Sequence, residues 1–437
     1  MADRRVAVTG LGVVTAGGIG AEEFWQSLRE GRKCIRRIQR FDPVNFPCHV
    51  AGQIEDFSAH KFVPKNYRKS VKVMSRDIEI AVAASDLAFK DAQITTRAAN
   101  DQEMSIDSHR LGCNIGAGLI CCDLDELGMA AITSVTDGKF DIRSWGQGGM
   151  NNLTPLWLLK YLPNMLSCHV TIIHGAEGPS NCITCGAASG LLSAAEGGRW
   201  IRRNEADAVI AGGAEAKLIP LGLLRQSLLN RLCRNGNDDP PSACRPFDAR
   251  HSGTVMGEGG GLLILEDMDR AQGRGANIYA ELVGFGAACD PDGINVTNAT
   301  AGGMDLAAKK ALADAGILPQ DIDMIAAHGT GVAEEDRCEA IAWRATFGQR
   351  VQNIPAAAFT GGIGSLFAGQ SGATLVATAL ALHKQTVPPT ANFETPFDGC
   401  TLNLASEPRE VHIRYAIVGA FSVGGLSAAC ILKRYEP

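Results

Sequence analysis

The chain has 437 residues, 46% of them apolar, and its 41 basic and 47 acidic residues give a formal net charge of -6. Two fused halves are the natural expectation, because single cores stop growing beyond about 250–300 residues. The acidic balance argues against a nucleic-acid partner, which needs clustered Lys and Arg. The sequence contains no apolar run of the roughly 18 residues that a membrane helix needs, and its N-terminus leads into a predicted strand without a hydrophobic leader. We therefore expect a cytoplasmic protein with no membrane partner.

The 14 cysteines are scattered, and several lie inside apolar runs. Cys182 and Cys185 have a CxxC spacing, but no second pair of Cys or His completes a zinc site. Reduced thiols that pack as small apolar side chains are the expected state. We predict no metal and no cofactor.

Strand-like apolar runs alternate with helical stretches, which is typical of an α/β protein with buried sheets. The helical stretches are apolar on most sides, so we expect them to be sandwiched between sheets. The predicted strands are 6–8, 208–211, 261–265, 324–327 and 416–420, and the predicted helices are 77–90, 186–203 and 372–383.

The boundary between the halves is predicted at a charged connector that contains glycine, residues 270–276, ahead of a new strand at Ile278. This divides the chain into residues 1–270 and 271–437.

Three motifs follow one another along the chain. Gly-Pro-Ser at 178–180 and Ser-Gly at 189–190 come first, then Arg-Pro-Phe-Asp-Ala-Arg at 245–250 with Gly-Glu-Gly-Gly-Gly and a strand to Glu266. Ala-His-Gly-Thr-Gly at 327–331, with Asp336 and Glu339, is the third. In this order and spacing they resemble the β-ketoacyl synthase family of the thiolase fold, and the likeness runs from about residue 5 to residue 433.

The resemblance implies a thiolase-like five-layer α-β-α-β-α fold of two similar halves. In the family, a cysteine at a strand-to-helix turn takes an acyl group from an acyl carrier protein as a thioester. Two histidines then assist decarboxylation of malonyl carrier protein and stabilise the enolate, and backbone N–H groups form an oxyanion hole.

The nucleophile position departs from this pattern. In the family's frame of equal length to residues 178–190 the cysteine is tenth, and the tenth residue here is Ala187. An alanine methyl cannot form a thioester. Cys185, two residues earlier, is either a displaced nucleophile or a small buried side chain.

The second histidine and the family's lysine are also replaced. With Gly364 as the anchor, Ser365 falls at the histidine and Thr360 at the lysine. The loop also carries one residue more than usual, and its form resembles that of chain-length factors, the catalytically silent partners of ketosynthases in type II polyketide synthases.

His328 is the catalytic-type side chain that remains. It is either a hydrogen-bond donor to an enolate or carbonyl, or a buried structural histidine held by Asp336 or Glu339. Chain-length factors of aromatic polyketide systems usually lose this segment, so its retention argues against a simple assignment to that group.

The glycine-rich segment 419–425 resembles the family's C-terminal loop, in which a phenylalanine gates the pocket and a backbone N–H completes the oxyanion hole. The resemblance implies a substrate-binding role for Phe421, Ser422, Gly424 and Gly425, with Phe421 as the gate. A glycine-rich turn under a phosphate is the rival interpretation, but no P-loop accompanies it.

Two further segments bear on partners. Residues 61–76 concentrate six basic residues without an acid, and this segment is either a carrier-protein patch or an ordinary solvated face. Residues 116–127 match the stretch that in the family crosses the dimer interface and lines the partner's acyl tunnel, although its apolar residues are equally suited to an interface core. The patch candidates are Lys65, Arg68, Lys69 and Lys72, and the dimer or tunnel candidates are Ile120, Cys121 and Leu124.

The sequence leaves three hypotheses. The preferred one is a ketosynthase-like subunit without the nucleophilic Cys, similar to a chain-length factor, that forms a heterodimer with an active ketosynthase; a homodimer is the other possibility. The second is an enzyme of altered chemistry, such as a malonyl-carrier-protein decarboxylase or a non-covalent acyltransferase that uses His328. The third is an engineered Cys-to-Ala form of a β-ketoacyl carrier-protein synthase, but such a change would not explain Ser365 and Thr360.

Overall fold

The structure is a computed structural model that describes residues 4–100, 103–119, 121–293, 297 and 300–436. No helix of the described part is long and apolar enough to cross a bilayer.

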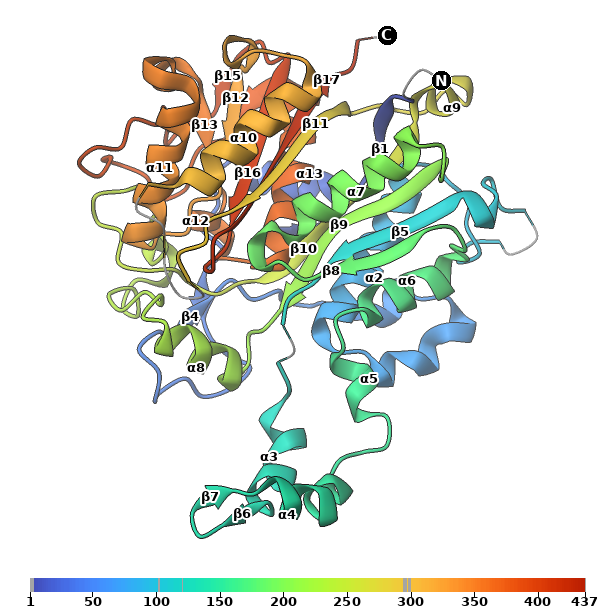
Figure 1. The fold of residues 1–437 in the computed structure, drawn as a ribbon, viewed down its shortest axis with the longest axis vertical. Coiled ribbons are helices and arrows are strands. Elements are labelled where there is room, and N and C mark those ends of the chain that lie inside the picture. The colour runs from blue at the N-terminus through green and yellow to red at the C-terminus, as the bar shows by residue number, and fades with distance from the viewer. Residues whose placement is uncertain (1–3, 101–102, 120, 294–296, 298–299, 437) are drawn as a thin grey trace.

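One mixed sheet runs through the molecule (Figure 1). Its strands follow the order β13-β12-β16-β17-β11-β1-β10-β9-β5-β8, and β2 pairs with β1 beside this path. Four of the five predicted strands are contained in strands of the sheet, and the fifth, β12, ends one residue earlier than predicted. The strands are β1 (Val6–Thr15), β2 (Gly18–Ile19), β5 (Leu111–Gly116), β8 (Ser180–Ile183), β9 (Ala208–Ala216), β10 (Glu258–Asp267), β11 (Ala280–Cys289), β12 (Met324–Ala326), β13 (Ala356–Ala357), β16 (Tyr415–Phe421) and β17 (Leu426–Arg434).

Apart from β2, the sheet consists of two sets of five strands that repeat one topology. In β8-β5-β9-β10-β1 the first three strands are parallel and the last two pairings are antiparallel, and β13-β12-β16-β17-β11 has the same pattern. The two sets meet where β1 pairs antiparallel with β11. The α/β class and the two similar halves that the resemblance implies are confirmed. The boundary between residues 270 and 271 falls inside α9 (Met268–Gly273), just before β11, and stays a prediction.

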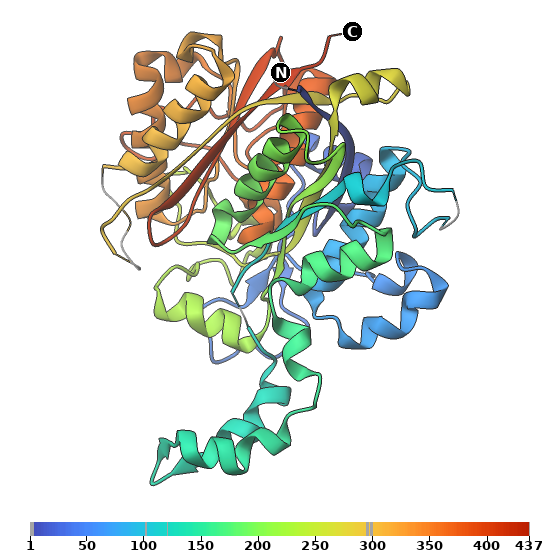
Figure 2. The same cartoon turned by 45° about the vertical axis from the view of Figure 1, so that its right-hand side comes forward.

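Helices form the other layers (Figures 1 and 2). α7 and α13 lie between the two sets of strands, and both helices contact strands of each set. α2 covers an outer face with α6, and α10 and α11 lie on the opposite side. The prediction that the apolar helices lie between layers of strands is therefore right for α7 and α13. It is wrong for α2, whose buried face packs on β1, β9 and β10 on the outside of the sheet. Besides α9, the α-helices of the described residues are α1 (Ala21–Arg29), α2 (Arg76–Asp91), α3 (Leu124–Ile132), α4 (Ile142–Gln147), α5 (Trp157–Tyr161), α6 (Met165–His174), α7 (Ser189–Arg202), α8 (Pro220–Leu228), α10 (Gly302–Ala315), α11 (Ala333–Phe347), α12 (Thr360–Ile363) and α13 (Ala368–Lys384).

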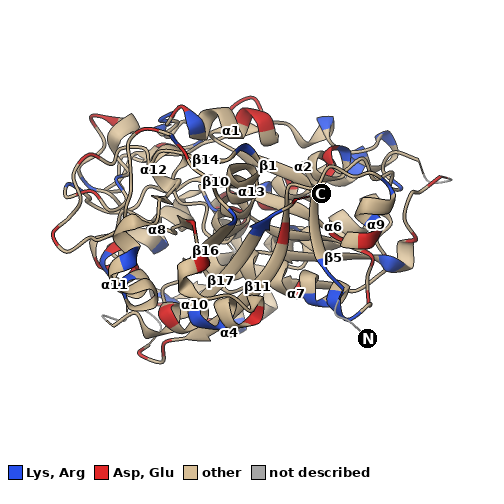
Figure 3. Cartoon of the chain, turned by 90° about the horizontal axis from the view of Figure 1, so that it is seen from above, with Lys and Arg blue, Asp and Glu red and all other residues tan. Residues whose placement is uncertain are grey.

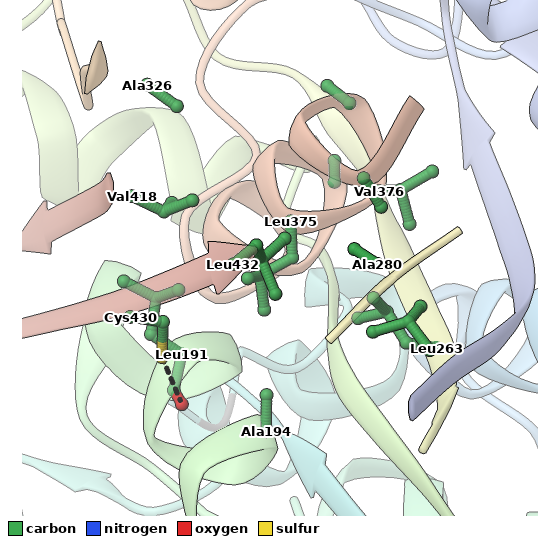
Figure 4. Close-up of a cluster of buried hydrophobic side chains, with 14 of the residues drawn as sticks. Leu191, Ala194, Leu263, Ala280, Ala326, Leu375, Val376, Val418, Cys430 and Leu432 are labelled. Atoms are coloured by element: carbon green, nitrogen blue, oxygen red, sulfur yellow. Dashed lines mark hydrogen bonds between the residues drawn. The ribbon is translucent and has the colours of Figure 1, made fainter. Parts of the chain in front are cut away.

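A large cluster of buried hydrophobic side chains surrounds these middle helices (Figure 4). Leu191 of α7 and Leu375 of α13 pack with Leu263 of β10 and Leu432 of β17. α13 is buried along residues 368–382, and small residues allow its close approach: a Cβ on Gly372 would lie 2.3 Å from the carbonyl oxygen of Gly261. The middle layer therefore fixes the helix and strand ends that carry the site.

An arm projects from the body between β5 and α6 (Figures 1 and 2). It contains α3, α4 and α5 with the short hairpin of β6 (Val135–Thr136) and β7 (Lys139–Phe140). The other short pairs are β3 (Arg36–Arg37) with β4 (Val50–Ala51) and β14 (Thr386–Val387) with β15 (Arg409–Glu410). The 3₁₀ helices are η1 (Ala59–Lys61), η2 (Lys65–Val73), η3 (Ser108–Arg110), η4 (Gly149–Asn152), η5 (Gly186–Ala188), η6 (Pro240–Ser242), η7 (Pro319–Asp321) and η8 (Gly348–Asn353).

Candidate active-site cavity

A cavity of about 250 Å³ lies beside the start of α7. Residues from distant parts of the chain meet there, among them Ala187, His328 and Ser365, the positions predicted for the family's nucleophile and two histidines. The predicted site residues in its lining are Cys121, Ala187, His328, Ser365, Phe421 and Ser422, whereas Thr360, Leu124, Gly424 and Gly425 lie outside it.

Ala187 lies in η5, the turn that joins β8 to the first residue of α7. Ser189 fixes this turn, because its hydroxyl accepts the N–H of Cys185 at 2.8 Å and donates to the carbonyl of Gly186 at 2.6 Å. A side chain at position 187 is thus presented to the cavity at the start of a helix, where a thiol would be activated. The methyl group of Ala187 offers no nucleophile.

The Cys185 side chain does not face this cavity. It lies outside the cavity lining, and burial raises the pKa of its thiol, which opposes thiolate formation. Its carbonyl accepts the hydroxyl of Ser422 at 3.0 Å. Cys185 therefore helps to join the η5 turn to the end of β16.

His328 follows β12 and is 3% exposed. Its ring meets the ring of Phe421 edge to face, with centroids 5.2 Å apart. Burial lowers the pKa of the imidazole to about 4, with Glu335 raising it and Arg231 lowering it. No described residue hydrogen-bonds to the imidazole ring, so a neutral His328 is available to a ligand at pH 7.

Asp336 and Glu339 bind the backbone of residues 328–331, here called the histidine loop, and not the imidazole. Glu339 accepts the N–H groups of His328 at 2.7 Å and Gly329 at 2.8 Å, and Asp336 accepts that of Thr330 at 2.8 Å. The interpretation of His328 as a histidine held by one of these acids is therefore wrong for its side chain. Their carboxylates shape the loop that presents the ring.

Ser365 and Thr360 lie on the same chain segment but have different surroundings. Ser365 is 3% exposed, lines the cavity, and its N–H donates to the carbonyl of Val255 at 2.8 Å. Thr360, in α12, is fully buried and its hydroxyl donates to the carbonyl of Gly329. Thr360 thus supports the histidine loop from behind.

Phe421 and Ser422 stand at the tip of the hairpin between β16 and β17. The N–H of Ser422 donates to the carbonyl of Leu426 at 2.8 Å. Because successive N–H groups of a strand point to opposite sides, the N–H of the preceding residue, Phe421, points away from β17. Gly424 and Gly425 form the turn with φ of 98° and 87°, values that favour glycine. These two glycines shape the hairpin that carries Phe421 and are not part of the cavity lining.

Family models give the assignment. Residues 3–271 match "Beta-ketoacyl synthase, N-terminal domain", and residues 279–394 match "Beta-ketoacyl synthase, C-terminal domain". The chain belongs to the β-ketoacyl synthase family.

Its relatives span its whole length. A 3-oxoacyl-[acyl-carrier-protein] synthase 2 of Synechocystis sp. is 33% identical, with 99% of each chain covered. The enzyme of the same name from Coxiella burnetii is 31% identical, also over 99% of each. Among solved structures, "The ishigamide ketosynthase/chain length factor" is 27% identical with a TM-score of 0.84 and full coverage of both chains. "AntDE:AntF (apo): type II PKS acyl-carrier protein in complex with its ketosynthase bound to the hexaketide" is 26% identical with a TM-score of 0.83, over 99% of this chain and 100% of that one.

The predicted tunnel segment of this ketosynthase homologue divides between cavity and arm. Cys121 is 4% exposed and lines the cavity, and burial raises the pKa of its thiol. Leu124 begins α3 on the arm and is 45% exposed. Ile120 lies outside the described residues.

The predicted carrier-protein patch lies on η2. Lys65, Arg68, Lys69 and Lys72 are all exposed, and none of them forms an ion pair within the described part of the chain. Seen from above, segments with Lys and Arg are interspersed with segments with Asp and Glu (Figure 3).

Sequence reasoning missed the charged side of the cavity. Glu215 and Lys217 at the end of β9, and Arg225 and Arg231 in and after α8, all belong to its lining. The available signal was the switch from an apolar strand to Glu-Ala-Lys at 215–217, followed by two arginines.

Glu215 is 6% exposed, and its carboxylate accepts the N–H of Ala368 at 2.7 Å, at the start of α13. Burial raises the pKa of Glu215 to about 7, although Lys217 lowers it. Lys217 in turn forms an ion pair with Asp77 of α2. Burying this cluster is costly, so such groups are functional candidates.

Proposed function

We propose that this chain is a non-condensing subunit of fatty acid or type II polyketide biosynthesis that pairs with an active ketosynthase, in the manner of a chain-length factor. The observation that carries the proposal is Ala187 at the nucleophile turn, in one cavity with Ser365 at the second-histidine position. Without a thiolate at that turn, the ordinary acyl-enzyme cycle cannot begin.

The relatives support the coarser part of this proposal. The curated ones are named as 3-oxoacyl-[acyl-carrier-protein] synthase 2, and two structural neighbours are a ketosynthase/chain length factor and a type II polyketide ketosynthase with its acyl carrier protein. They support an acyl carrier protein as a partner of this chain.

The arm supports a second protein subunit as a partner. The arm exposes many large apolar side chains close together. Monomeric soluble proteins rarely have large exposed apolar patches, so such a patch indicates an interaction site. They are Leu124, Met129, Ile132, Val135, Phe140, Ile142, Met150, Leu156, Leu158 and Leu159.

The exposed basic side chains of η2 are suited to an acidic carrier protein. Opposite charges steer such an encounter and raise its rate at low salt. We propose Lys65, Arg68, Lys69 and Lys72 as the carrier-protein contact.

Co-expression with a cysteine-bearing ketosynthase tests the pairing. We expect the two chains to co-purify and to elongate acyl carrier protein substrates together, whereas this chain alone does not elongate them. A stable homodimer that elongates acyl chains by itself would refute the proposal.

A second candidate function rests on His328, which remains neutral in the cavity. A carrier-bound malonyl group would lose its carboxylate as CO₂ when the bond between carboxylate carbon and α-carbon breaks, and the enolate would take a proton to give acetyl carrier protein. His328 would donate a hydrogen bond to the enolate oxygen. We expect His328→Ala to abolish any such activity, and unchanged release of CO₂ would exclude it.

A further inference from the structure

Phe367 has a strained backbone conformation. It lies directly ahead of α13, with φ of 50° and ψ of −117°. A bulky residue is rarely found in this region, because its Cβ crowds the neighbouring backbone, whereas glycine adopts it freely. Such outliers persist only where the surrounding structure holds them, and they cluster at functional sites.

Hydrogen bonds hold the chain on both sides of Phe367. The N–H of Ala368 donates to the carboxylate of Glu215 at 2.7 Å. The N–H of Leu366 donates to the side-chain oxygen of Gln370 at 3.1 Å. Both neighbours of Phe367 are therefore fixed by buried side chains from β9 and α13.

The start of α13 is also packed too closely to move. A Cβ on Gly369 would lie 2.1 Å from the carbonyl oxygen of Gly259, and a Cβ on Gly213 would lie 2.2 Å from that of Ala368. The helix therefore cannot shift against β9 and β10 to relieve the strain at Phe367. The strain is maintained by packing and is not the mark of a loose loop.

The phenyl ring is what glycine could not supply at this position, and Phe367 lines the cavity. The ring is partly exposed and packs on a buried cluster that contains Met256, another lining residue. Phe367 and Met256 therefore contribute an apolar wall to the cavity.

A hydrocarbon chain in the cavity would be directed towards its apolar lining. Lys217, Arg225 and Arg231 line other parts, and a chain that removed water from them without replacing the hydrogen bonds would bind at a cost. Among the described lining residues, Phe367 and Phe421 carry the largest apolar side chains. The cavity measures about 250 Å³, below the roughly 300–1,000 Å³ of most ligand sites.

We propose that Phe367 limits the length of the acyl chain that the cavity admits, because its ring fills space into which a longer chain would extend. The strained backbone places the ring there. The inference rests on the proposed function in that the ligand is an acyl group, but its test needs no partner subunit.

Two variants without the ring separate its size from the backbone strain. Phe367→Gly removes both, whereas Phe367→Ala removes the ring and keeps a Cβ at positive φ. At an unstrained position glycine is less favourable than alanine, and at positive φ the order reverses. We therefore expect the higher melting temperature for Phe367→Gly. A higher melting temperature for Phe367→Ala would overturn the proposal, because the position would not be strained.

Titration calorimetry of the full chain with two thioesters measures the admitted length. The probes are the butanoyl and octanoyl thioesters of N-acetylcysteamine, which differ by four CH₂ groups. Each CH₂ that reaches an apolar environment strengthens binding about fourfold. We expect the preference for the octanoyl probe to be at least about tenfold greater in Phe367→Gly and in Phe367→Ala than in the wild type.

Phe41→Ala is the matched control, because Phe41 packs on the same buried cluster but is not part of the cavity lining. It should keep the wild-type preference. An equal preference in the wild type and in both ringless variants would overturn the proposal, as would failure of these variants to bind the octanoyl probe. A gain of the same size in Phe41→Ala would also overturn it, because loosening of the cluster would then explain the effect.

Co-expression tests the pairing separately. A chain that binds the probes as expected but does not pair with an active ketosynthase would refute the proposed heterodimer and leave the role of Phe367 intact.

Discussion

Ala187 offers no nucleophile at the η5 turn, but the lining of the cavity around it contains His328 and several cations. His328 is neutral at pH 7 and presents its ring beside Phe421, and Ser365, at the position predicted for the family's second histidine, offers a small hydroxyl to the cavity. A space that keeps one histidine and several cations is suited to holding an acyl group, whether or not it reacts.

His328 should make stability depend on pH in a defined direction. Burial lowers the pKa of the folded-state imidazole to about 4, whereas the unfolded chain takes up the proton near 6.5. The unfolded state thus binds more protons between these values, and stability is lost as the pH falls from about 6.5 to about 4. Between pH 6.5 and pH 4, the free energy of unfolding of the wild type should fall by roughly 3 kcal/mol more than that of His328→Gln. Urea unfolding at several pH values measures this difference. If the free energies of unfolding of the two proteins changed with pH in parallel, the prediction would be wrong.

At the level of single residues, sequence motifs predicted which positions lie around the cavity but not its charge. Ala187, His328 and Ser365 each stand in a recognisable frame. Arg231 and Lys217 do not, because their partners Glu335 and Asp77 lie 104 and 140 residues away. Such long-range ion pairs become visible only when the chain is folded.

At the level of elements, apolar runs located strands well but made most of them too short. The strand at 208–211 extends to Ala216, because small residues continue the buried strand past the apolar run. The arm escaped prediction because its apolar residues suggest a core, whereas the structure exposes them.

The arm gives a prediction at this scale. Met129 and Ile132 of α3 are 57% and 68% exposed, so Met129→Glu with Ile132→Glu should leave the melting temperature unchanged but abolish pairing with the active ketosynthase. The control is Leu318→Glu, since Leu318 is 57% exposed and lies off the arm, ahead of η7. Pull-down of the partner measures the effect. Pairing that survives the arm variant would remove the arm from the interface.

At the level of the whole molecule, the duplicated strand order explains the site. In the first half, the η5 turn ahead of α7 and the end of β9 bring Ala187 and Lys217 to the cavity. In the second half, the loop after β12 and the end of β16 bring His328 and Phe421 there. Periodicity predicted the α/β class. The arrangement in two similar halves rested on the resemblance, because single runs of residues do not say which strands pair.

We propose that this chain assists acyl transfer without forming an acyl-enzyme. Native mass spectrometry of the complex, supplied with acyl and malonyl carrier proteins, tests this proposal. We expect a heterodimer in which the acyl label is found on the partner ketosynthase only. A covalent acyl label on this chain would contradict it.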